Sequence, residues 1–349
     1  MDLSFYKNKR ILVTGHTGFK GSWLCKILLM NGAKVVGYSL EPTSNPNLFS
    51  ILGLGKQMIS IIGDIRDLKK LNSVFDEFQP EIVFHLAAQP IVRESYREPV
   101  YTYDVNVMGT VNICDCVRTH SSVKSFLNIT TDKVYQNDDD PNHSFKENEK
   151  LDGFDPYSNS KSCSEIITHS YFRCFLKEQN VAVSTARAGN VIGGGDFSVD
   201  RIIPDAARAL KNNETLMIRS PNSTRPYQHV LEPIFCYLLI AKEQCFHHDL
   251  CGAYNIGPDS CDFLTTQNLI ELFKKYSNGL KYEIQLNNGP HEATFLSLDN
   301  CKIKQTFNWS PKIHIEDAVR MTVEWYKAWV ESKDLISIIE RQIKEYFYE

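Results

Sequence analysis

Several features that would assign the chain to a particular class are missing from its sequence. No run approaches the roughly 18 consecutive apolar residues of a membrane helix, and the opening stretch MDLSFYKNKR is too polar for a signal peptide. The ten cysteines include no C-x-x-C pair, and the nearest two, Cys114 and Cys116, have poor spacing for a zinc site. We therefore expect no membrane span, no bound metal, and reduced thiols in a cytoplasmic protein.

An excess of positive charge is also missing. The 38 Lys and Arg residues are matched by 42 Asp and Glu residues, which gives a formal net charge of -4 over 349 residues. Nucleic-acid-binding proteins normally present a basic face, so we expect no nucleic-acid partner. Hydrophobic residues, by contrast, make up 42% of the chain, enough for the core of one large domain or two smaller ones.

The first half of the chain alternates short apolar runs with segments of helical spacing. The expected strands are 10–14, 34–39, 58–64, 81–88, 124–130 and 181–188, and the expected helices are 18–32, 68–78, 100–118 and 157–178. Buried strands joined by helices imply right-handed crossovers and a parallel sheet covered on both faces. The sequence therefore predicts an α/β fold with a Rossmann-type doubly wound parallel sheet.

The pattern changes after about residue 190. Expected helices at 201–211, 230–245, 265–276 and 315–332 are separated by loops rich in Gly, Pro and Asn. We expect residues 1–190 to form an NAD-binding domain, which a strand or helix from the C-terminal half may complete. Residues 191–349 would form a smaller, mostly α/β lobe that binds a nucleotide sugar.

The stretch VTGHTGFKG follows the first expected strand and opens the first helix. Its glycines, Gly15, Gly18 and Gly21, have G-x-x-G-x-x-G spacing. Glycines in this position allow a tight turn and let the backbone approach a pyrophosphate at a helix N-terminus. Any tight turn between a strand and a helix could use the same residues, but the strand–loop–helix context favours a dinucleotide.

Two observations bear on which dinucleotide would bind. No Arg or Lys lies between Lys34 and Lys56 to meet the 2′-phosphate of NADP, so the sequence favours NAD. Asp64 ends the third expected strand, where its carboxylate could accept a hydrogen bond from the adenine amino group. The spacing fits an N-cap of the following helix equally well.

The stretch ITTDKVYQN brings two hydroxyls, a carboxylate and an ammonium together at the end of the fifth expected strand. Thr131, Asp132 and Lys133 are consecutive there. A structural turn does not need this combination, and doubly wound sheets bind ligands at the carboxyl ends of their strands. We therefore expect these residues to belong to an active site.

A second reactive pair lies one strand further along the chain. DPYSNSKSCSE begins an expected helix and places Tyr157 and Lys161 four residues apart on one face. A tyrosine with a pKa near 10 is a poor base at neutral pH. A neighbouring ammonium and a nicotinamide cation would favour the phenolate, which could then take a proton from a sugar hydroxyl.

These motifs together resemble the extended short-chain dehydrogenase/reductase superfamily, and within it the CDP-glucose 4,6-dehydratase subfamily. Phe197 and Tyr227 stand where that subfamily usually has Trp, an exchange that keeps an aromatic surface and is not expected to change the reaction class. The similar segments reach to about Trp329. They are GHTGFKGSWL (15–24), HLAAQ (85–89), YDVNVMGT (103–110), DPYSNSKSCSE (155–165), RAGNVIGGGDF (187–197), DRIIPD (200–205) and RPYQHVLEP (225–233).

The resemblance implies NAD as the cofactor and a CDP-sugar as the substrate. The implied cofactor-binding residues are Gly15, Thr17, Gly18, Phe19, Lys20, Gly21, Asp64, Ile65, Leu86, Ala87, Ala88, Asn106, Tyr157 and Lys161. The implied substrate-binding residues are Gln89, Asn190, Arg201, Arg219, Arg225 and His229. Arg225 is the first candidate for the diphosphate and Arg219 the weakest, because each arginine could instead form a surface salt bridge. His229 could support the site indirectly or be a structural histidine.

The resemblance also implies a mechanism. Tyr157, helped by Lys161 and the Thr131 hydroxyl, would remove the proton of the sugar 4-OH while hydride leaves C4 for NAD. Asp132, protonated in a dry site, would be the acid for the departing 6-hydroxyl. Lys133 would be either the base for the C5 proton or an ion-pair partner that orients Asp132. Hydride returning to C6 would leave a 4-keto-6-deoxy sugar and water.

Other functions also fit the sequence. A nucleotide-sugar 4-epimerase would share the glycines and the Tyr–Lys pair but would not need an acid directed at C6. A dehydratase for another nucleotide hexose fits the same residues, and a non-catalytic NAD-binding protein is a remote alternative. The resemblance further implies a homodimer built from helices 100–118 and 157–178, or a homotetramer.

Overall fold

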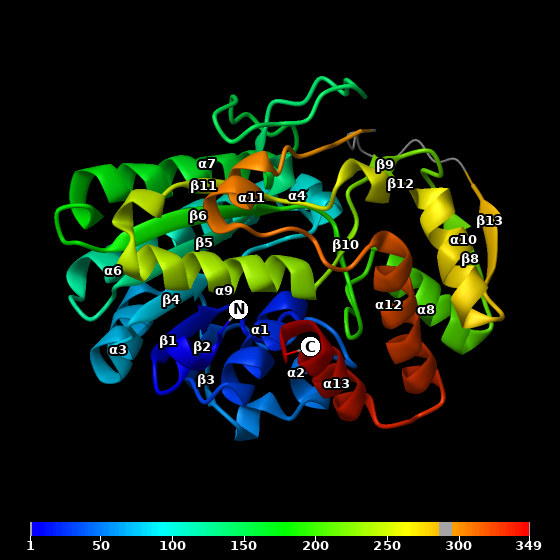
Figure 1. Cartoon of the computed structure of the whole chain (residues 1–349), viewed down its shortest axis with the longest axis horizontal. Helices are drawn as coiled ribbons and strands as arrows, with labels where there is room; N and C mark the ends of the chain where they lie inside the picture. The colour runs from blue at the N-terminus through cyan, green and yellow to red at the C-terminus, as the bar shows by residue number, and fades with distance from the viewer. Residues whose placement is uncertain (1, 286–294, 349) are drawn as a thin grey trace.

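The structure, a computed structural model, describes residues 2–285 and 295–348 and is built on a parallel sheet of strand order β11-β6-β5-β4-β1-β2-β3 (Figure 1). The strands are β1 (Arg10–Thr14), β2 (Lys34–Ser39), β3 (Ile59–Ile62), β4 (Ile82–His85), β5 (Ser125–Thr131), β6 (Ala182–Ala188) and β11 (Ala253–Ile256). All neighbouring pairs run parallel. The predicted doubly wound fold is confirmed, and the strand order reverses between β1 and β4, where such sheets bind ligands.

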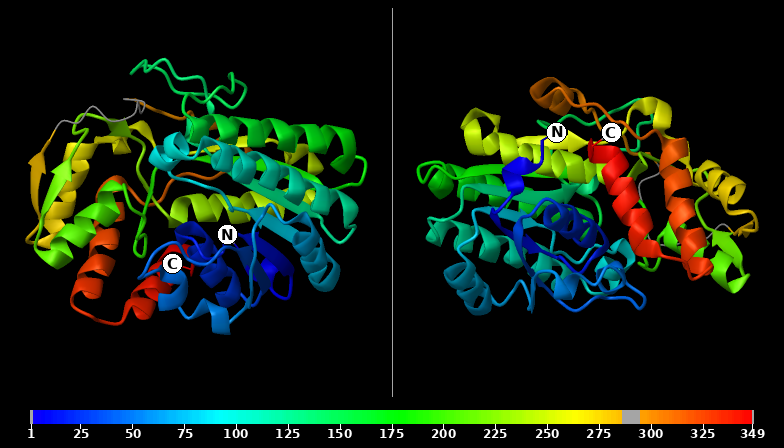
Figure 2. Two further views of the ribbon diagram at one scale, coloured as in Figure 1. Left: turned by 180° about the vertical axis from the view of Figure 1, so that it is seen from behind. Right: turned by 60° about the horizontal axis from the view of Figure 1, so that its bottom comes forward.

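Helices cover both faces of the sheet (Figures 1 and 2). The long helices are α1 (Phe19–Met30) and α9 (Leu231–Phe246) on one face, and α3 (Leu68–Phe78), α6 (Gly109–Thr119) and α7 (Pro156–Tyr171) on the other. Alternate residues of β1 enter different cores. Ile11 and Val13 join the cluster with α1 and α9, whereas Leu12 joins the cluster with α3 and α6. Burial on both faces explains why β1 and β4 have apolar residues at successive positions.

The second half of the chain adds a smaller group of elements next to the carboxyl ends of β5 and β6. These elements are α8 (Ile202–Asn212), β8 (Thr215–Ile218), α10 (Thr266–Ser277), β13 (Lys281–Ile284) and α12 (Ile315–Val330). β8 and β13 form a parallel pair of their own. Because β11 and α9 also come from this half but pack on the main sheet, the domain division near residue 190 stays a prediction.

The last helix, α13 (Leu335–Tyr348), packs on the N-terminal half of the chain through an ion pair of 2.6 Å between Lys26 Nζ and Glu340 Oε1. The remaining elements are short. They are α2 (Leu48–Ile51), α4 (Val92–Arg97), α5 (Pro99–Tyr103), β7 (Val191–Ile192), β9 (Thr224–Arg225), β10 (Gln228–His229), β12 (Leu264–Thr265) and α11 (Cys301–Phe307), with the single turns η1 (Ser4–Tyr6), η2 (Leu54–Lys56), η3 (Asp104–Met108), η4 (Asp132–Val134), η5 (Phe172–Leu176), η6 (His248–Leu250) and η7 (Ser260–Asp262).

The expected boundaries differ from the observed ones in a few informative places. The helix expected over 100–118 is α5, a π turn at η3 and then α6, and the helix expected over 157–178 ends in a second π turn at η5. β4 ends at His85 and not at Ala88, because the Thr14 hydroxyl accepts the N–H groups of Leu86 and Ala87. The chain thereby leaves the sheet beside the glycine loop.

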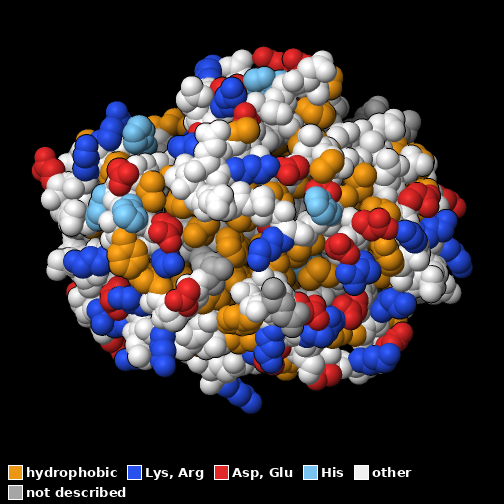
Figure 3. All heavy atoms as spheres, viewed as in Figure 1, with side chains coloured by type: hydrophobic (Ala, Val, Ile, Leu, Met, Phe, Trp, Pro, Cys, Tyr) orange, Lys and Arg blue, Asp and Glu red, His pale blue; other side chains and the backbone are white. Residues whose placement is uncertain are grey.

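The surface carries charges of both signs, and the cysteines are not paired. On the face shown in Figure 3, acidic and basic side chains are interspersed. All ten cysteines carry free thiols. In the described part of the chain, no helix combines the length and apolar character that crossing a membrane requires.

Candidate active site

The glycine loop between β1 and α1 has no room for a side chain at Gly15 or Gly21. Gly15 has a φ of +72°, and a Cβ there would lie 2.8 Å from the backbone nitrogen of Ala87. A Cβ at Gly21 would lie 2.2 Å from the Gly15 carbonyl oxygen. Gly18 precedes the first residue of α1 and supplies no side-chain cap, so the first N–H groups of the helix are available to an anion. The cradle fits a dinucleotide pyrophosphate.

Gly21→Ala tests this cradle. We expect it to weaken NAD binding at least about tenfold and to lower the free energy of unfolding by about 1–3 kcal/mol, because the new methyl group overlaps the loop backbone. Calorimetric titration with NAD and thermal unfolding measure the two effects. Gly55→Ala is the matched control, since its Cβ would meet the Phe49 ring at an ordinary 3.6 Å. Equal NAD affinity in the Gly21→Ala and Gly55→Ala variants would contradict the cradle.

The N-cap role considered for Asp64 is wrong. Asp67 caps α3 by accepting the Lys70 N–H at 3.0 Å. The Asp64 carboxylate instead accepts two hydrogen bonds from the Arg66 guanidinium, at 3.0 and 2.7 Å, and these lower the pKa of Asp64. Arg66 also reaches Asp104 at 2.8 Å, so the end of β3 is tied to the start of η3.

The other residues predicted to bind the cofactor differ in their burial and in their contacts. The Thr17 hydroxyl lies 2.9 Å from the Ser39 hydroxyl and donates to the Leu40 carbonyl, also at 2.9 Å. Ile65 is buried against Gly109 of α6. Leu86, Ala87 and Ala88 follow β4 directly and are partly exposed. Phe19 and Lys20, in the first turn of α1, line the large cavity described below.

That cavity, of about 460 Å³, opens at the carboxyl ends of β5 and β6. The predicted site residues that line it are Phe19, Lys20, Thr131, Asp132, Lys133, Tyr157, Asn190, Arg201, Arg219 and Arg225. Segments far apart in the sequence therefore meet in one place. The site combines the strand end at Thr131–Lys133, the first turn of α7 and the loops before α8 and after β8.

Asp132 is buried, and its two carboxylate oxygens differ in their contacts. Oδ1 accepts a hydrogen bond from the Thr131 hydroxyl at 2.9 Å. Oδ2 has no hydrogen-bond partner among the described residues, and Gly189 leaves space beside it, since a Cβ at that position would lie 3.1 Å from this oxygen. Burial raises the pKa of Asp132, although the charge of Lys133 and the Thr131 hydrogen bond oppose this shift. Such a carboxyl is suited to hold a proton and donate it into the cavity.

The Tyr157 phenol lies at the N-terminal end of α7. This helix starts sharply, because the Asp155 carboxylate accepts the Ser158 N–H at 3.0 Å and Pro156 occupies the first helical position. Burial raises the pKa of Tyr157 to about 12, while a hydrogen bond with Thr131 and the charge of Arg201 act in the opposite direction. A bound cation is therefore needed before the phenolate forms near neutral pH.

The two lysines at the centre of the site differ in environment. Lys161 is buried and donates to the Ile129 carbonyl at 3.2 Å, and burial, assisted by the charge of Lys20, lowers its pKa to about 8. Lys133 is partly exposed on the cavity wall. Within the described ranges, Lys133 forms no ion pair with Asp132, so the orienting pair considered from the sequence is absent as a direct contact.

The outer part of the cavity is rich in arginine. Arg201 pairs with the buried Asp196 at 3.1 Å, and Arg219 pairs with Asp200 at 3.0 Å. Arg93 of α4 reaches the same Asp200 carboxylate at 3.7 Å. Sequence reasoning missed Arg93, since VRESYREP looks like an ordinary exposed helix. Arg225 is buried and contacts the Thr224 carbonyl at 3.1 Å.

Among the predicted residues that do not line the cavity, Gln89, Asn106 and His229 are buried in other contacts. Gln89 is buried, and its amide group is already used by Thr102 at 2.9 Å and by the Ile91 N–H at 2.6 Å. Asn106 fixes it in place by accepting the Gln89 N–H at 2.8 Å. His229 is fully buried near Trp23, and burial lowers its pKa to about 3, which supports the structural role rather than contact with a ligand.

The two aromatic exchanges noted in the sequence have different surroundings. Tyr227 lines the cavity. Phe197 does not; its ring packs 5.1 Å from Trp329 and 5.9 Å from Trp325 in the core between β7 and α12. Of the two aromatic exchanges, only the one at Tyr227 therefore lies at the cavity wall.

Comparison with known proteins gives consistent matches. The family model described as GDP-mannose 4,6 dehydratase matches residues 12–322. The CDP-glucose 4,6-dehydratase of Salmonella typhimurium is 41% identical over 99% of this chain and 98% of its own. The dTDP-D-glucose 4,6-dehydratase of Dictyostelium discoideum is 29% identical over 72% of this chain and 58% of its own.

Solved structures match as well. The UDP-glucose 4-epimerase of Thermotoga maritima aligns with a TM-score of 0.78 at 22% identity, covering 92% of this chain and 99% of that one. The dTDP-glucose 4,6-dehydratase of Bacillus anthracis, solved with NAD, aligns with a TM-score of 0.76 at 22% identity, covering 94% and 99%. At these identities the likeness establishes a shared fold.

Proposed function

This chain belongs to the GDP-mannose 4,6 dehydratase family, and on that premise we propose that it converts CDP-glucose to CDP-4-keto-6-deoxyglucose and water, with NAD as cofactor. The observation that carries the proposal is the buried Asp132, which lines the same cavity as Thr131 and Tyr157 and has one carboxylate oxygen without a hydrogen-bond partner among the described residues. An acid and a phenol in one cavity suit a reaction that first oxidises C4 and then expels the 6-hydroxyl.

The residues around the glycine loop would hold the cofactor. Gly15, Gly18 and the N-terminus of α1 would bind its pyrophosphate, and the absence of a cation between Lys34 and Lys56 favours NAD over NADP. Asp64 would accept from adenine while keeping its pair with Arg66. Bound NAD would take up hydride from C4 of the sugar and return it to C6.

The chain's own groups would perform the proton transfers. Tyr157 would accept the 4-OH proton, with Thr131 holding the phenol and Lys161 adding positive charge behind it. Asp132 would then donate a proton to the 6-hydroxyl, which leaves as water. Lys133, as the neutral amine, would remove the proton at C5, since it lies on the same cavity wall and has no ion pair with Asp132.

The outer arginines would bind the substrate diphosphate. Arg225 is buried at the cavity wall, and Arg201, Arg219 and Arg93 surround the opening. A guanidinium binds phosphate oxygens through two parallel hydrogen bonds, so this group provides both charge and orientation. Asn190, which follows β6, would contact the sugar or the diphosphate.

We further propose that the protein is a homodimer or a tetramer of such dimers, located in the cytoplasm. Exposed apolar side chains cluster on the packed helices α5, α6 and α7 and their connections: Val100 (82% exposed), Phe154 (72%), Ile166 (56%), Met108 (47%) and Phe175 (44%). A surface of this kind on a soluble enzyme marks a contact with another subunit. We also propose that the reaction belongs to deoxysugar biosynthesis for lipopolysaccharide or capsule.

A panel of nucleotide sugars tests the proposal. Purified protein is incubated with CDP-, GDP-, UDP- and dTDP-glucose, with and without added NAD. The masses of the products are then measured by mass spectrometry. We expect CDP-glucose to be converted fastest to a product lighter by one water. A product of unchanged mass would instead identify a 4-epimerase, the second candidate, which shares Tyr157 and Lys161 but has no use for Asp132.

A further inference from the structure

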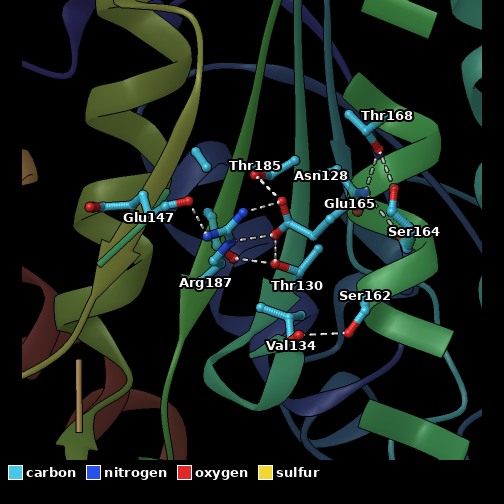
Figure 4. Close-up of polar contacts among 12 residues, drawn as sticks. Asn128, Thr130, Val134, Glu147, Ser162, Ser164, Glu165, Thr168, Thr185 and Arg187 are labelled. Carbon is cyan, nitrogen blue, oxygen red and sulfur yellow. Dashed lines mark hydrogen bonds and ion pairs between the residues drawn. The ribbon is translucent and has the colours of Figure 1, made fainter. Parts of the chain in front are cut away.

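A buried carboxylate lies on α7 two helical turns beyond the reactive tyrosine. Glu165 is 3% exposed and accepts hydrogen bonds at both oxygens (Figure 4). Arg187 of β6 donates to the two oxygens in parallel, each at 3.0 Å. The Thr185 hydroxyl donates at 2.6 Å, and the Thr130 hydroxyl donates to the remaining side of the carboxylate. Both carboxylate oxygens of Glu165 therefore accept hydrogen bonds from Arg187 and from a threonine hydroxyl.

These contacts join the two halves of the proposed catalytic centre. Glu165 follows Tyr157 by eight residues and Lys161 by four, so the three side chains share the face of α7 that is turned to the sheet. Thr130 directly precedes Thr131 and Asp132 at the end of β5. One carboxylate therefore fixes the helix that carries the phenol against the strand end that carries the acid.

The guanidinium extends the connection to the segment that follows Lys133. Arg187 Nη1 donates to the Glu147 carbonyl at 2.9 Å (Figure 4). The same nitrogen donates to the Tyr135 hydroxyl at 2.7 Å. The Tyr135 hydroxyl in turn donates to the Asn255 side chain of β11 at 2.6 Å. The chain on both sides of the Thr131–Lys133 stretch is thereby anchored to one buried pair.

We propose that the Glu165–Arg187 pair is a positioning device that sets the distance between Tyr157 and Asp132 and so links C4 oxidation to loss of water. The proposal rests on the dehydratase function proposed above. A buried ion pair contributes little net stability compared with apolar residues of the same size, so stability alone does not account for it. Displacement of reacting groups by about 1 Å lowers rates by about 10²-fold, so a device that fixes their separation has a direct kinetic effect.

Glu165→Gln tests the proposal, with Glu232→Gln as the matched control. Glutamine keeps the shape but cannot accept the two parallel bonds from Arg187. We expect kcat for CDP-glucose dehydration to fall by roughly 10–100-fold with KM little changed. Glu232 is equally buried and accepts from the Lys312 and Ile313 N–H groups and the Tyr346 hydroxyl, away from the cavity. Its variant is expected to lose stability and to keep the wild-type kcat below its unfolding temperature.

A milder pair of variants decides the question if Glu165→Gln does not fold. Thr130→Val removes one donor and is expected to lower kcat by about tenfold, whereas Thr130→Ser keeps the hydroxyl and recovers most of the rate. Wild-type kcat in folded Glu165→Gln or in Thr130→Val would overturn the inference and leave the pair as part of the core. Wild-type protein that releases no dehydrated product would overturn the proposed function, and the inference with it.

Discussion

Tyr157→Phe is expected to lower the turnover of CDP-glucose by about 10²–10⁴-fold and to leave NAD binding in place. The substitution removes the oxygen that would take the 4-OH proton, while the ring keeps its packing at the start of α7. The glycine loop, which would hold most of the cofactor, is untouched. Steady-state kinetics and calorimetric titration with NAD measure the two quantities separately.

Tyr237→Phe serves as the control for this variant. Tyr237 of α9 is fully buried, and its hydroxyl has no hydrogen-bond partner among the residues that the structure describes. Its removal therefore deletes the same atom from a tyrosine that does not line the cavity. Full turnover by the Tyr157→Phe protein would show that another group takes the proton, and equal losses in both variants would point to a general loss of packing.

Asp132→Asn is expected to separate oxidation from water loss. Asparagine keeps the shape and the Thr131 contact but has no proton to give to the 6-hydroxyl, so dehydration should slow by about 10²–10⁴-fold. Tyr157 and Lys133 remain, so the proton at C5 should still exchange. CDP-glucose recovered from deuterated water should then carry deuterium at C5, which NMR detects.

Two further variants sharpen this test. Asp200→Asn changes a carboxylate of the same cavity that pairs with Arg93 and Arg219, and it should alter KM without uncoupling exchange from water loss. Lys133→Met in the Asp132→Asn background should abolish exchange at C5 if Lys133 is the base. Dehydration by Asp132→Asn at the wild-type rate would remove Asp132 from the mechanism.

Much of the architecture could be predicted because the relevant signals are local. The apolar runs that correspond to β1, β4, β5 and β6 are too short to form helices. They also lack the alternation of apolar and polar residues that a half-exposed strand shows, so they predict buried strands of a parallel sheet. β11 was not located, since AYNI is short and its place beside β6 is set by α9 and the loop before it. The helix α13 was not predicted either, because it lies beyond Trp329, where the resemblance to known proteins ends.

The site could be predicted where chemistry depends on strand ends and helix spacing. The Thr131–Lys133 stretch and Tyr157 meet in one cavity because β5 ends and α7 begins at the same edge of the sheet. Contacts between distant segments could not be read from the sequence. Neither the Asp200 carboxylate shared by Arg93 and Arg219, nor the inward packing of Phe197, leaves a local pattern.

The most direct test of the dehydratase mechanism follows the hydrogen on C4. CDP-glucose carrying deuterium at C4 is incubated with the purified protein and NAD, and the sugar product is analysed by mass spectrometry and NMR. We predict a product lighter by one water in which the deuterium is found in the C6 methyl group. A product of unchanged mass with deuterium still on C4, or a dehydrated product with no deuterium on C6, would contradict the transfer from C4 to C6.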